Sequence, residues 1–280
     1  MRTSELEIIG ERTSRTIEGI IRDSILSDKK AALTAFTLIL IVAEILSVTD
    51  PLWGVVLHSF TLGLTLLYSA LMVRFSPDIS KLFAVLLPVP LIRIVSVSSP
   101  LLEFTMVEWF LIISIMLFSS ILISLRLTGV SIEEYGFRMP ERKHYFLETS
   151  IIAIGIGFGM VEFLILTPEP ISRDITTLGI IPPLVGLYFS TGLLEELLFR
   201  GLIQKHSSDC LGAFYGIIFT TLIFMIMHTG WQSFLDIIFV GIVGAIYSVI
   251  VHRTGSIVGV SFSHAMVNIS LFVISPELIG

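Results

Sequence analysis

The chain has 280 residues, of which 54% are hydrophobic and only 14% are charged, and its mean hydropathy is +0.93. Soluble domains carry about 25% charged residues, so this composition predicts a polytopic membrane protein. The formal net charge of −6 argues against a nucleic-acid-binding protein, because no basic surface is available to neutralise phosphates. The single cysteine, Cys210, excludes an internal disulfide bond.

Residues 1–30 form a polar N-terminal arm. Four isoleucines in this arm fall on one helical face: Ile17, Ile20, Ile21 and Ile25. The pattern predicts a short amphipathic helix on the membrane surface, with a solvated tail as the alternative. The arm lacks the apolar core of a signal peptide, so we expect the first spanning helix to direct membrane insertion.

The rest of the chain is dominated by long apolar segments, and a spanning helix needs about 20 such residues. We therefore predict an all-α fold, a polytopic bundle of eight or nine transmembrane helices around a polar cavity. The candidate spans are residues 31–48, 52–73, 82–98, 104–125, 146–166, 180–204, 211–229, 233–251 and 256–275. Pro88 and Pro90 predict a break in the third span, which Arg93 weakens further, and a re-entrant third segment would change the count.

Basic residues indicate the orientation of the bundle. Lys and Arg occur before the first span and in every second connection after it, whereas three of the alternate connections contain none: 49–51, 99–103 and 230–232. The positive-inside rule then places the N-terminus in the cytoplasm and the C-terminus outside, in a plasma membrane or a membrane of the endoplasmic-reticulum type. The longest cytoplasmic connection, 126–145, separates N-terminal helices at 31–125 from a C-terminal core at 146–276.

Two adjacent carboxylates and a guanidinium lie inside one apolar segment of that core. Each ionisable group near the bilayer centre costs ~2.5–3.5 kcal/mol on insertion scales, so we expect these three to have partners or a function. Glu196 precedes Arg200 by four residues, the favourable order for an ion pair on one helical face. Glu195 points about 100° away and lacks such a partner. A carboxylate in a membrane cavity suits a general base, so Glu195 is the predicted catalytic carboxylate and Glu196 and Arg200 are supporting residues.

Two later segments carry polar side chains at the same helical spacing. His264 and Asn268 are four residues apart and face the same way, so both are able to donate to one developing oxyanion. Phe224 and His228 share a face near the end of the seventh span, where His228 is predicted to hold a water with Glu195 or to protonate the leaving amine. The structural alternative is that these side chains only hydrogen-bond neighbouring helices. Four further histidines have no partner at helical spacing and are assigned no function: His58, His144, His206 and His252.

The depth of each residue in the membrane tests whether Glu195, His228 and His264 are able to form one site. Counted from the cytoplasmic ends at 1.5 Å per residue, Glu195 and His264 lie roughly 15 Å deep, whereas His228 would lie about 25 Å deep. The three residues meet only if the seventh span tilts or starts further out. We expect the site that they form to open toward the cytoplasm.

Three motifs therefore follow in chain order: Glu-Glu-x-x-x-Arg at 195–200, Phe-x-x-x-His at 224–228 and His-x-x-x-Asn at 264–268. Together they resemble the CPBP family of intramembrane proteases, which includes the type II CAAX prenyl endopeptidases. The resemblance covers roughly residues 130–275. It implies that Glu195 activates water with His228 and that His264 and Asn268 stabilise the oxyanion. The implied substrate is a membrane-associated, possibly prenylated, protein or peptide.

Zinc is an open alternative, because Glu195, His228 and His264 form a plausible zinc set with a fourth position for water. The sequence has no His-Glu-x-x-His helix, the usual signature of intramembrane zinc proteases. Histidines that carry protons or donate to an oxyanion are also not free to bind a metal. We therefore expect no cofactor.

Two functions of other classes compete with the protease. A non-catalytic scaffold or immunity protein of the same family is disfavoured by the complete polar set. A transporter would also explain intramembrane charges. No inverted repeat and no matched pair of broken helices is found in the two halves, which disfavours that function.

Overall fold

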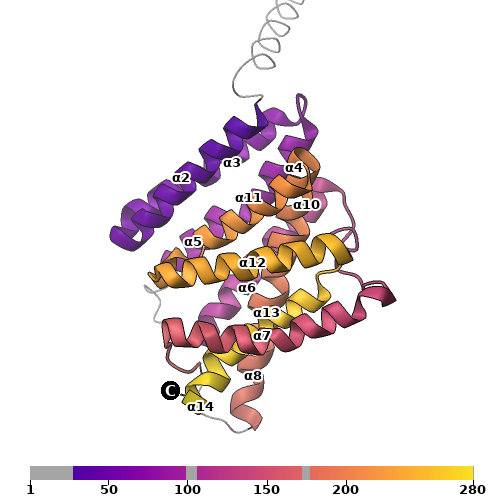
Figure 1. Ribbon diagram of the computed structural model, residues 1–280. Helices are drawn as coiled ribbons and strands as arrows, with labels where there is room; N and C mark the ends of the chain where they lie inside the picture. Colours follow the sequence, from indigo (N-terminus) through magenta and orange to yellow (C-terminus); the bar gives the residue numbers. More distant parts are fainter. Residues whose placement is uncertain (1–27, 99–105, 172–176, 280) are drawn as a thin grey trace, which may run out of the picture.

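The computed structural model describes residues 28–98, 106–171 and 177–279, and every regular element within these residues is a helix (Figure 1). The all-α prediction is therefore confirmed. The predicted surface helix in residues 1–30 lies almost entirely outside the described residues. Lys29 is the first residue of the first described helix and follows a cap in which Asp28 accepts a hydrogen bond from Lys30 N.

The N-terminal half consists of five helices: α2 (Lys29–Thr49), α3 (Pro51–Met72), α4 (Pro77–Leu86), α5 (Pro88–Ser98) and α6 (Met106–Thr128). Asp50 ends α2 and caps α3, so these two helices form a tight antiparallel hairpin. The predicted break in the third span is confirmed at Leu87, between α4 and α5. Pro77 and Pro88 each begin a helix, where the missing N–H costs nothing.

The C-terminal half contains α7 (Tyr145–Leu166), α8 (Thr177–Leu187), η4 (Tyr188–Leu193), α9 (Leu194–Glu196), η5 (Leu197–Ile203), α10 (Gln204–Leu211), α11 (Ala213–Ile226), α12 (Phe234–Thr254), α13 (Val258–Ile269), η7 (Ser270–Ile274) and α14 (Ser275–Ile279). The short 3₁₀ turns η3 (Arg142–His144) and η6 (Thr229–Trp231) precede α7 and follow α11. The segments η4, η5 and η7 are π-helical.

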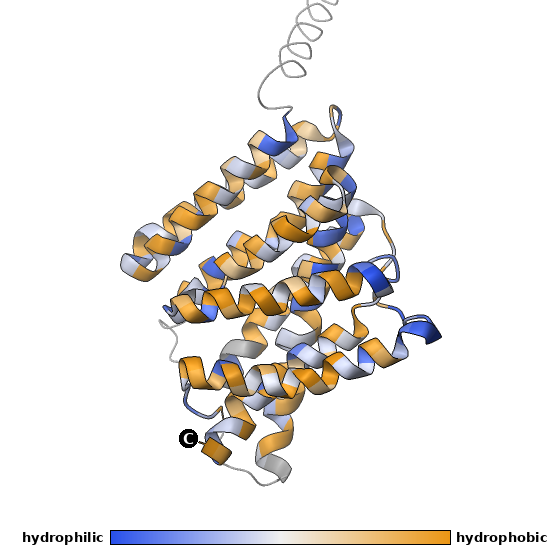
Figure 2. Cartoon of the chain, viewed as in Figure 1, coloured by the Kyte–Doolittle hydropathy of each residue, from blue (hydrophilic) through white to orange (hydrophobic). Residues whose placement is uncertain are grey.

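Eight of the described helices are long and apolar enough to cross a membrane, and they correspond to eight of the nine predicted spans. The other predicted span, 180–204, lies within the stretch Thr177–Leu211, which is helical throughout and contains two of the π-helical segments. Hydrophobic residues predominate along most of the length of the long helices, and hydrophilic residues are found mainly toward helix ends and connections (Figure 2). Large side chains such as Leu164 and Phe234 are exposed by 71% and 75%, as expected for a surface that faces lipid. The protein is an integral membrane protein.

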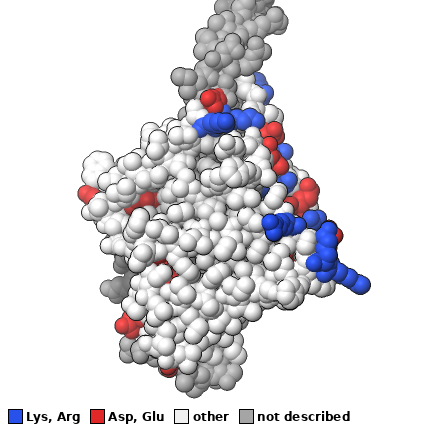
Figure 3. All heavy atoms as spheres, viewed as in Figure 1, with Lys and Arg blue, Asp and Glu red and all other residues white. Residues whose placement is uncertain are grey.

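Lys and Arg gather along one edge of the molecule, whereas the broad face beside it is almost free of them (Figure 3). This distribution matches the connections that the sequence marks as basic. Arg93 and Arg200 are the two buried basic residues in the part of the chain that the structure describes. Both charges are buried within apolar segments of a membrane protein, so each needs a partner there.

Small residues bring α7 against α13, the helix that carries His264 and Asn268. A Cβ at Gly155 would lie 2.5 Å from the Ser263 carbonyl oxygen, and a Cβ at Gly159 would lie even closer to the Val267 carbonyl oxygen. Glu148 on α7 accepts a hydrogen bond from Gly259 N at 2.6 Å and so caps the first turn of α13. Glycine packing and a carboxylate cap together position α13 on α7.

We expect Gly155→Ala to lower the free energy of unfolding by about 1–3 kcal/mol, because the new methyl group meets backbone that cannot move aside. Gly157→Ala is the matched control on the same helix, since no atom lies within 4 Å of its Cβ position. Thermal unfolding in detergent measures both variants. Equal midpoints for the two would contradict the close α7–α13 contact.

Candidate functional site

Glu195 and Glu196 lie in α9, a single α-helical turn between the π-helical segments η4 and η5. A π-helical segment inserts extra residues per turn and changes the direction of the side chains that follow it. Glu195 lines a cavity and forms no hydrogen bond with any residue that the structure describes. Glu196 is fully buried and points away from that cavity toward other helices.

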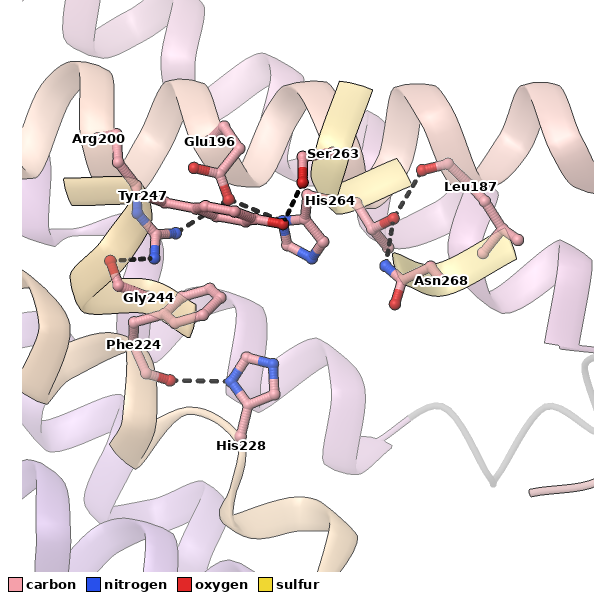
Figure 4. Close-up of polar contacts among 11 residues, drawn as sticks. Leu187, Glu196, Arg200, Phe224, His228, Gly244, Tyr247, Ser263, His264 and Asn268 are labelled. Atoms are coloured by element: carbon pink, nitrogen blue, oxygen red, sulfur yellow. Dashed lines mark hydrogen bonds and ion pairs between the residues drawn. The ribbon is translucent and has the colours of Figure 1, made fainter. Parts of the chain in front are cut away.

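Glu196 is the centre of a buried polar cluster (Figure 4). Its Oε1 accepts a hydrogen bond from Arg200 Nη1 at 3.0 Å, which confirms the predicted ion pair. The same oxygen lies 2.7 Å from His264 Nδ1, a contact between helices that the spacing of the residues did not predict. Because the carboxylate accepts this hydrogen bond, Nδ1 carries the proton and the ring presents Nε2 at its other end.

Arg200 connects this cluster to two further helices. Its Nη2 donates to the Gly244 carbonyl oxygen on α12 at 3.2 Å, and its guanidinium lies 4.1 Å from the centre of the Phe224 ring on α11. A Cβ at Gly244 would lie 2.9 Å from Arg200 Nη2, so glycine is needed for this approach. The cation thereby contacts a carboxylate, a carbonyl and an aromatic face.

His228 follows the end of α11 and enters the site from another direction. Its Nδ1 donates to the Phe224 carbonyl oxygen at 2.9 Å, which leaves Nε2 with a free lone pair in the neutral ring. The Phe224 ring lies 4.6 Å from the His228 ring and 6.1 Å from the His264 ring, measured between ring centres. Phe224 therefore holds the two histidines in a fixed arrangement.

Asn268 lies one turn after His264 and is oriented by a residue that the sequence reasoning missed. Its Nδ2 donates to Thr191 Oγ1 at 2.8 Å, and Thr191 in turn donates to the Leu187 carbonyl oxygen at 2.6 Å. Because the Thr191 hydroxyl proton is used on Leu187, its oxygen is available as the acceptor. One amide N–H of Asn268 is thus held by Thr191 while the other remains available.

All four predicted catalytic residues line one cavity of about 1000 Å³: Glu195, His228, His264 and Asn268. The predicted supporting residues Glu196 and Arg200 lie behind its wall. The sequence placed His228 deeper in the membrane than Glu195 and His264 on the assumption of a straight seventh span. His228 instead lies beyond the last turn of α11, so its position does not follow the axis of that helix. The sequence reasoning missed Thr191, Tyr247 and Glu162 in the lining, since none of them has a motif partner along the chain.

The cavity opens at the end of the bundle opposite the exposed Lys and Arg. The exposed residues of its lining are Val48, Pro51, Gly230, Trp231 and Gln232, which lie at connections without basic residues. From the sequence we expect the basic end to be cytoplasmic and the site to open to the cytoplasm. Both expectations cannot hold in this structure, because the mouth of the cavity and the basic residues lie at opposite ends of the bundle.

Within the described residues, no group of three His, Cys, Asp or Glu side chains is arranged to hold a metal ion. The Nδ1 atoms of both histidines are occupied by hydrogen bonds, and only their Nε2 atoms are left for a ligand. Independence from a metal stays a prediction.

The site lies in the part of the chain for which a family is recognised. Residues 177–270 match the family model described as type II CAAX prenyl endopeptidase Rce1-like. This segment is similar to an Rce1-like domain. The match confirms the predicted family over these residues and supports an intramembrane protease of the CAAX type. It includes every predicted site residue, whereas α2 to α7 lie outside it. No curated protein and no solved structure matches the chain.

We expect Glu196→Gln to lower the free energy of unfolding by about 3–5 kcal/mol, because it leaves Arg200 as a buried cation without its carboxylate. The same substitution at Glu195 is the matched control, since that neighbouring side chain has no hydrogen-bond partner to lose. Thermal unfolding in detergent compares them. A midpoint for Glu196→Gln equal to that of Glu195→Gln would show that the cluster does not stabilise the fold.

Proposed function

We propose that this protein is an intramembrane endopeptidase that hydrolyses a peptide bond in a membrane-associated, CAAX-type prenylated substrate, with Glu195 as the general base. One observation carries the proposal. Glu195, His228, His264 and Asn268 come from three separate helical segments of an Rce1-like domain and line the same cavity. Of these, Glu195 is a carboxylate without a hydrogen bond to any described residue, so it is free to take a proton from water.

The first step is the attack of water on the substrate carbonyl carbon. A water between Glu195 and His228 donates one hydrogen bond to the carboxylate and the other to the lone pair of His228 Nε2. Glu195 takes a proton as the water oxygen forms its bond to carbon. The two acceptors hold the water in one orientation, so that a lone pair of its oxygen points at the substrate carbonyl carbon. Such positioning lowers the barrier to the attack.

The second step is the stabilisation of the tetrahedral oxyanion and its collapse. Asn268 donates its remaining amide N–H, while Thr191 holds the carboxamide in place. His264 donates from Nε2 as an imidazolium whose Nδ1–H stays hydrogen-bonded to the Glu196 carboxylate. The C–N bond then breaks, and the protonated Glu195 returns its proton to the leaving amine. The products are a carboxylic acid and an amine, and Glu195 ends as the carboxylate that it was at the start.

Glu196 and Arg200 act behind the site in this proposal. Glu196 fixes the orientation of His264, and Arg200 balances the carboxylate so that a buried anion is not left alone. Neither side chain touches the cavity. They are positioning residues, not catalytic ones.

A non-catalytic scaffold is the competing function. It would use the same buried cluster as a structural element, but it provides no reason for an unpaired carboxylate on the cavity wall. A transporter is disfavoured further, because the cavity is lined at its inner end by buried apolar side chains such as Leu117 and Val243.

We expect the purified protein in detergent to cleave a farnesylated CAAX peptide and Glu195→Gln to lose nearly all of this activity. Detergent leaves both ends of the bundle accessible, so the side of entry does not affect the assay. Mass spectrometry of the products identifies the cleaved bond. A chelator such as 1,10-phenanthroline, in the same assay, should leave the rate unchanged. Inhibition that zinc reverses would favour the metal mechanism, and wild-type turnover by Glu195→Gln would exclude the proposed base.

Asn268→Ala should lower kcat by ~10²–10³ while KM changes little, because a donor to the oxyanion acts only in the transition state. Thr191→Val keeps the shape of the side chain and removes the oxygen that orients Asn268, so we expect a smaller loss in the same parameter. Steady-state kinetics on the peptide separates kcat from KM. A change confined to KM would place Asn268 in substrate binding instead.

A further inference from the structure

A second buried ion pair lies at the side of the cavity that the N-terminal helices provide. Arg93 on α5 donates from Nε to Glu44 Oε1 on α2 at 2.7 Å. Both residues line the cavity, and the whole of Glu44 is 1% exposed. The pair lies outside the Rce1-like domain, and the sequence analysis assigned it no function.

Each member of this pair also holds the backbone segment that carries His228. Arg93 donates from Nη2 to the carbonyl oxygen of Met227, the residue before His228. Glu44 accepts from Thr229 Oγ1, the residue after His228, at 2.7 Å through its second oxygen Oε2. The two contacts therefore hold the chain on both sides of the histidine.

The segment needs such support because it is not part of a long helix. The helix α11 ends at Ile226, and η6 that follows it is a single 3₁₀ turn from Thr229 to Trp231. Gln232 then adopts a left-handed conformation with a φ of 54°. A short connection of this kind contributes few hydrogen bonds of its own, so contacts from outside decide where His228 lies.

The contacts also fit closely. A Cβ at Gly230 would lie 3.0 Å from Arg93 Nη1, so the guanidinium lies directly against the backbone of the segment. His58 on α3 lies 3.5 Å from the same carboxylate of Glu44, which adds a third N-terminal helix to the cluster. Two charges and a histidine are thus buried around one short segment of backbone. Their burial would be costly without a role.

We propose that Glu44 and Arg93 are positioning residues for His228, and that the N-terminal helices thereby complete the active site of the Rce1-like domain. This inference rests on the proposed function, because it assigns the pair a role in the same hydrolysis. Arg93 and Glu44 hold Met227 and Thr229, and these two residues fix the His228 ring relative to Glu195.

The experiment compares three variants with wild type. Arg93→Met removes the charge and the bond to Met227. Thr229→Val removes the bond to Glu44, together with the local contact of the same hydroxyl with the Ile226 carbonyl oxygen, while the ion pair stays intact. It therefore tests the proposal even if Arg93→Met does not fold. Thr65→Val is the control for the same chemical change, because among the described residues the Thr65 hydroxyl bonds just the Thr61 carbonyl oxygen on its own helix α3.

Hydrogen–deuterium exchange of residues 227–232 is the first readout and does not require activity. Four backbone hydrogen bonds protect amides in this segment, those donated by Met227, His228, Trp231 and Gln232. We expect exchange to become about tenfold faster in Arg93→Met and Thr229→Val and to stay unchanged in Thr65→Val. Wild-type exchange in Thr229→Val, and in any folded Arg93→Met, would overturn the proposal.

Kinetics on the farnesylated peptide is the second readout. We expect kcat to fall about 10- to 100-fold in the two site variants with KM within twofold, because a misplaced His228 impairs the attack on bound substrate. Faster exchange with unchanged kcat would show a structural contact only and overturn the positioning role. Absence of cleavage by wild type would count against the proposed function alone, and the exchange result would still decide whether the pair holds the segment.

Discussion

The carboxylate of Glu196 is the group on which the arrangement of the site depends. It is buried in a membrane protein and holds Arg200 and His264 through the same oxygen. A carboxylate at that depth is tolerated only with such partners, so three helical segments are drawn to one point. Once His264 is held there, Asn268 follows one turn later on the same helix. Arg200 extends the cluster to α12 through Gly244 and to α11 through Phe224. The arrangement of the candidate site thus follows from the need to partner one buried anion.

The adjacent carboxylate has the opposite environment. Glu195 lines the cavity without a hydrogen bond to a described residue, although it differs from Glu196 by a single position in the chain. One turn of α-helix between two π-helical segments separates the two side chains by about 100°. The fold therefore gives one carboxylate a structural role and leaves the other available for chemistry. This division of labour explains why two identical residues stand side by side in an apolar segment.

The N-terminal helices have more than one function in this arrangement. They provide much of the surface that faces lipid, but Glu44 and Arg93 also reach the segment around His228. Buried charges in a membrane protein mark the places where helices are held at a defined distance. Two buried ion pairs in the described chain are of this kind, one at Arg200 and one at Arg93, and each lies next to one of the two histidines of the site. The histidines are thus supported from opposite sides of the same cavity.

The sequence by itself determined the class of protein and the positions of the helices, and it supplied the candidates for the site residues. Long apolar segments leave a membrane helix as the only way to satisfy the backbone, and four-residue spacing places Glu196 with Arg200 and His264 with Asn268. These relations are local, so the chain alone specifies them.

Contacts between segments far apart in the chain were decided by the tertiary structure. His58 and His206 have no partner at helical spacing, yet they lie near Glu44 and Tyr135 from other segments. The contacts of His264 with Glu196, Asn268 with Thr191 and Arg93 with Met227 are of the same kind. The π-helical segments and the position of His228 beyond α11 also depend on packing, because local sequence does not fix where a helix loosens or how its end is held.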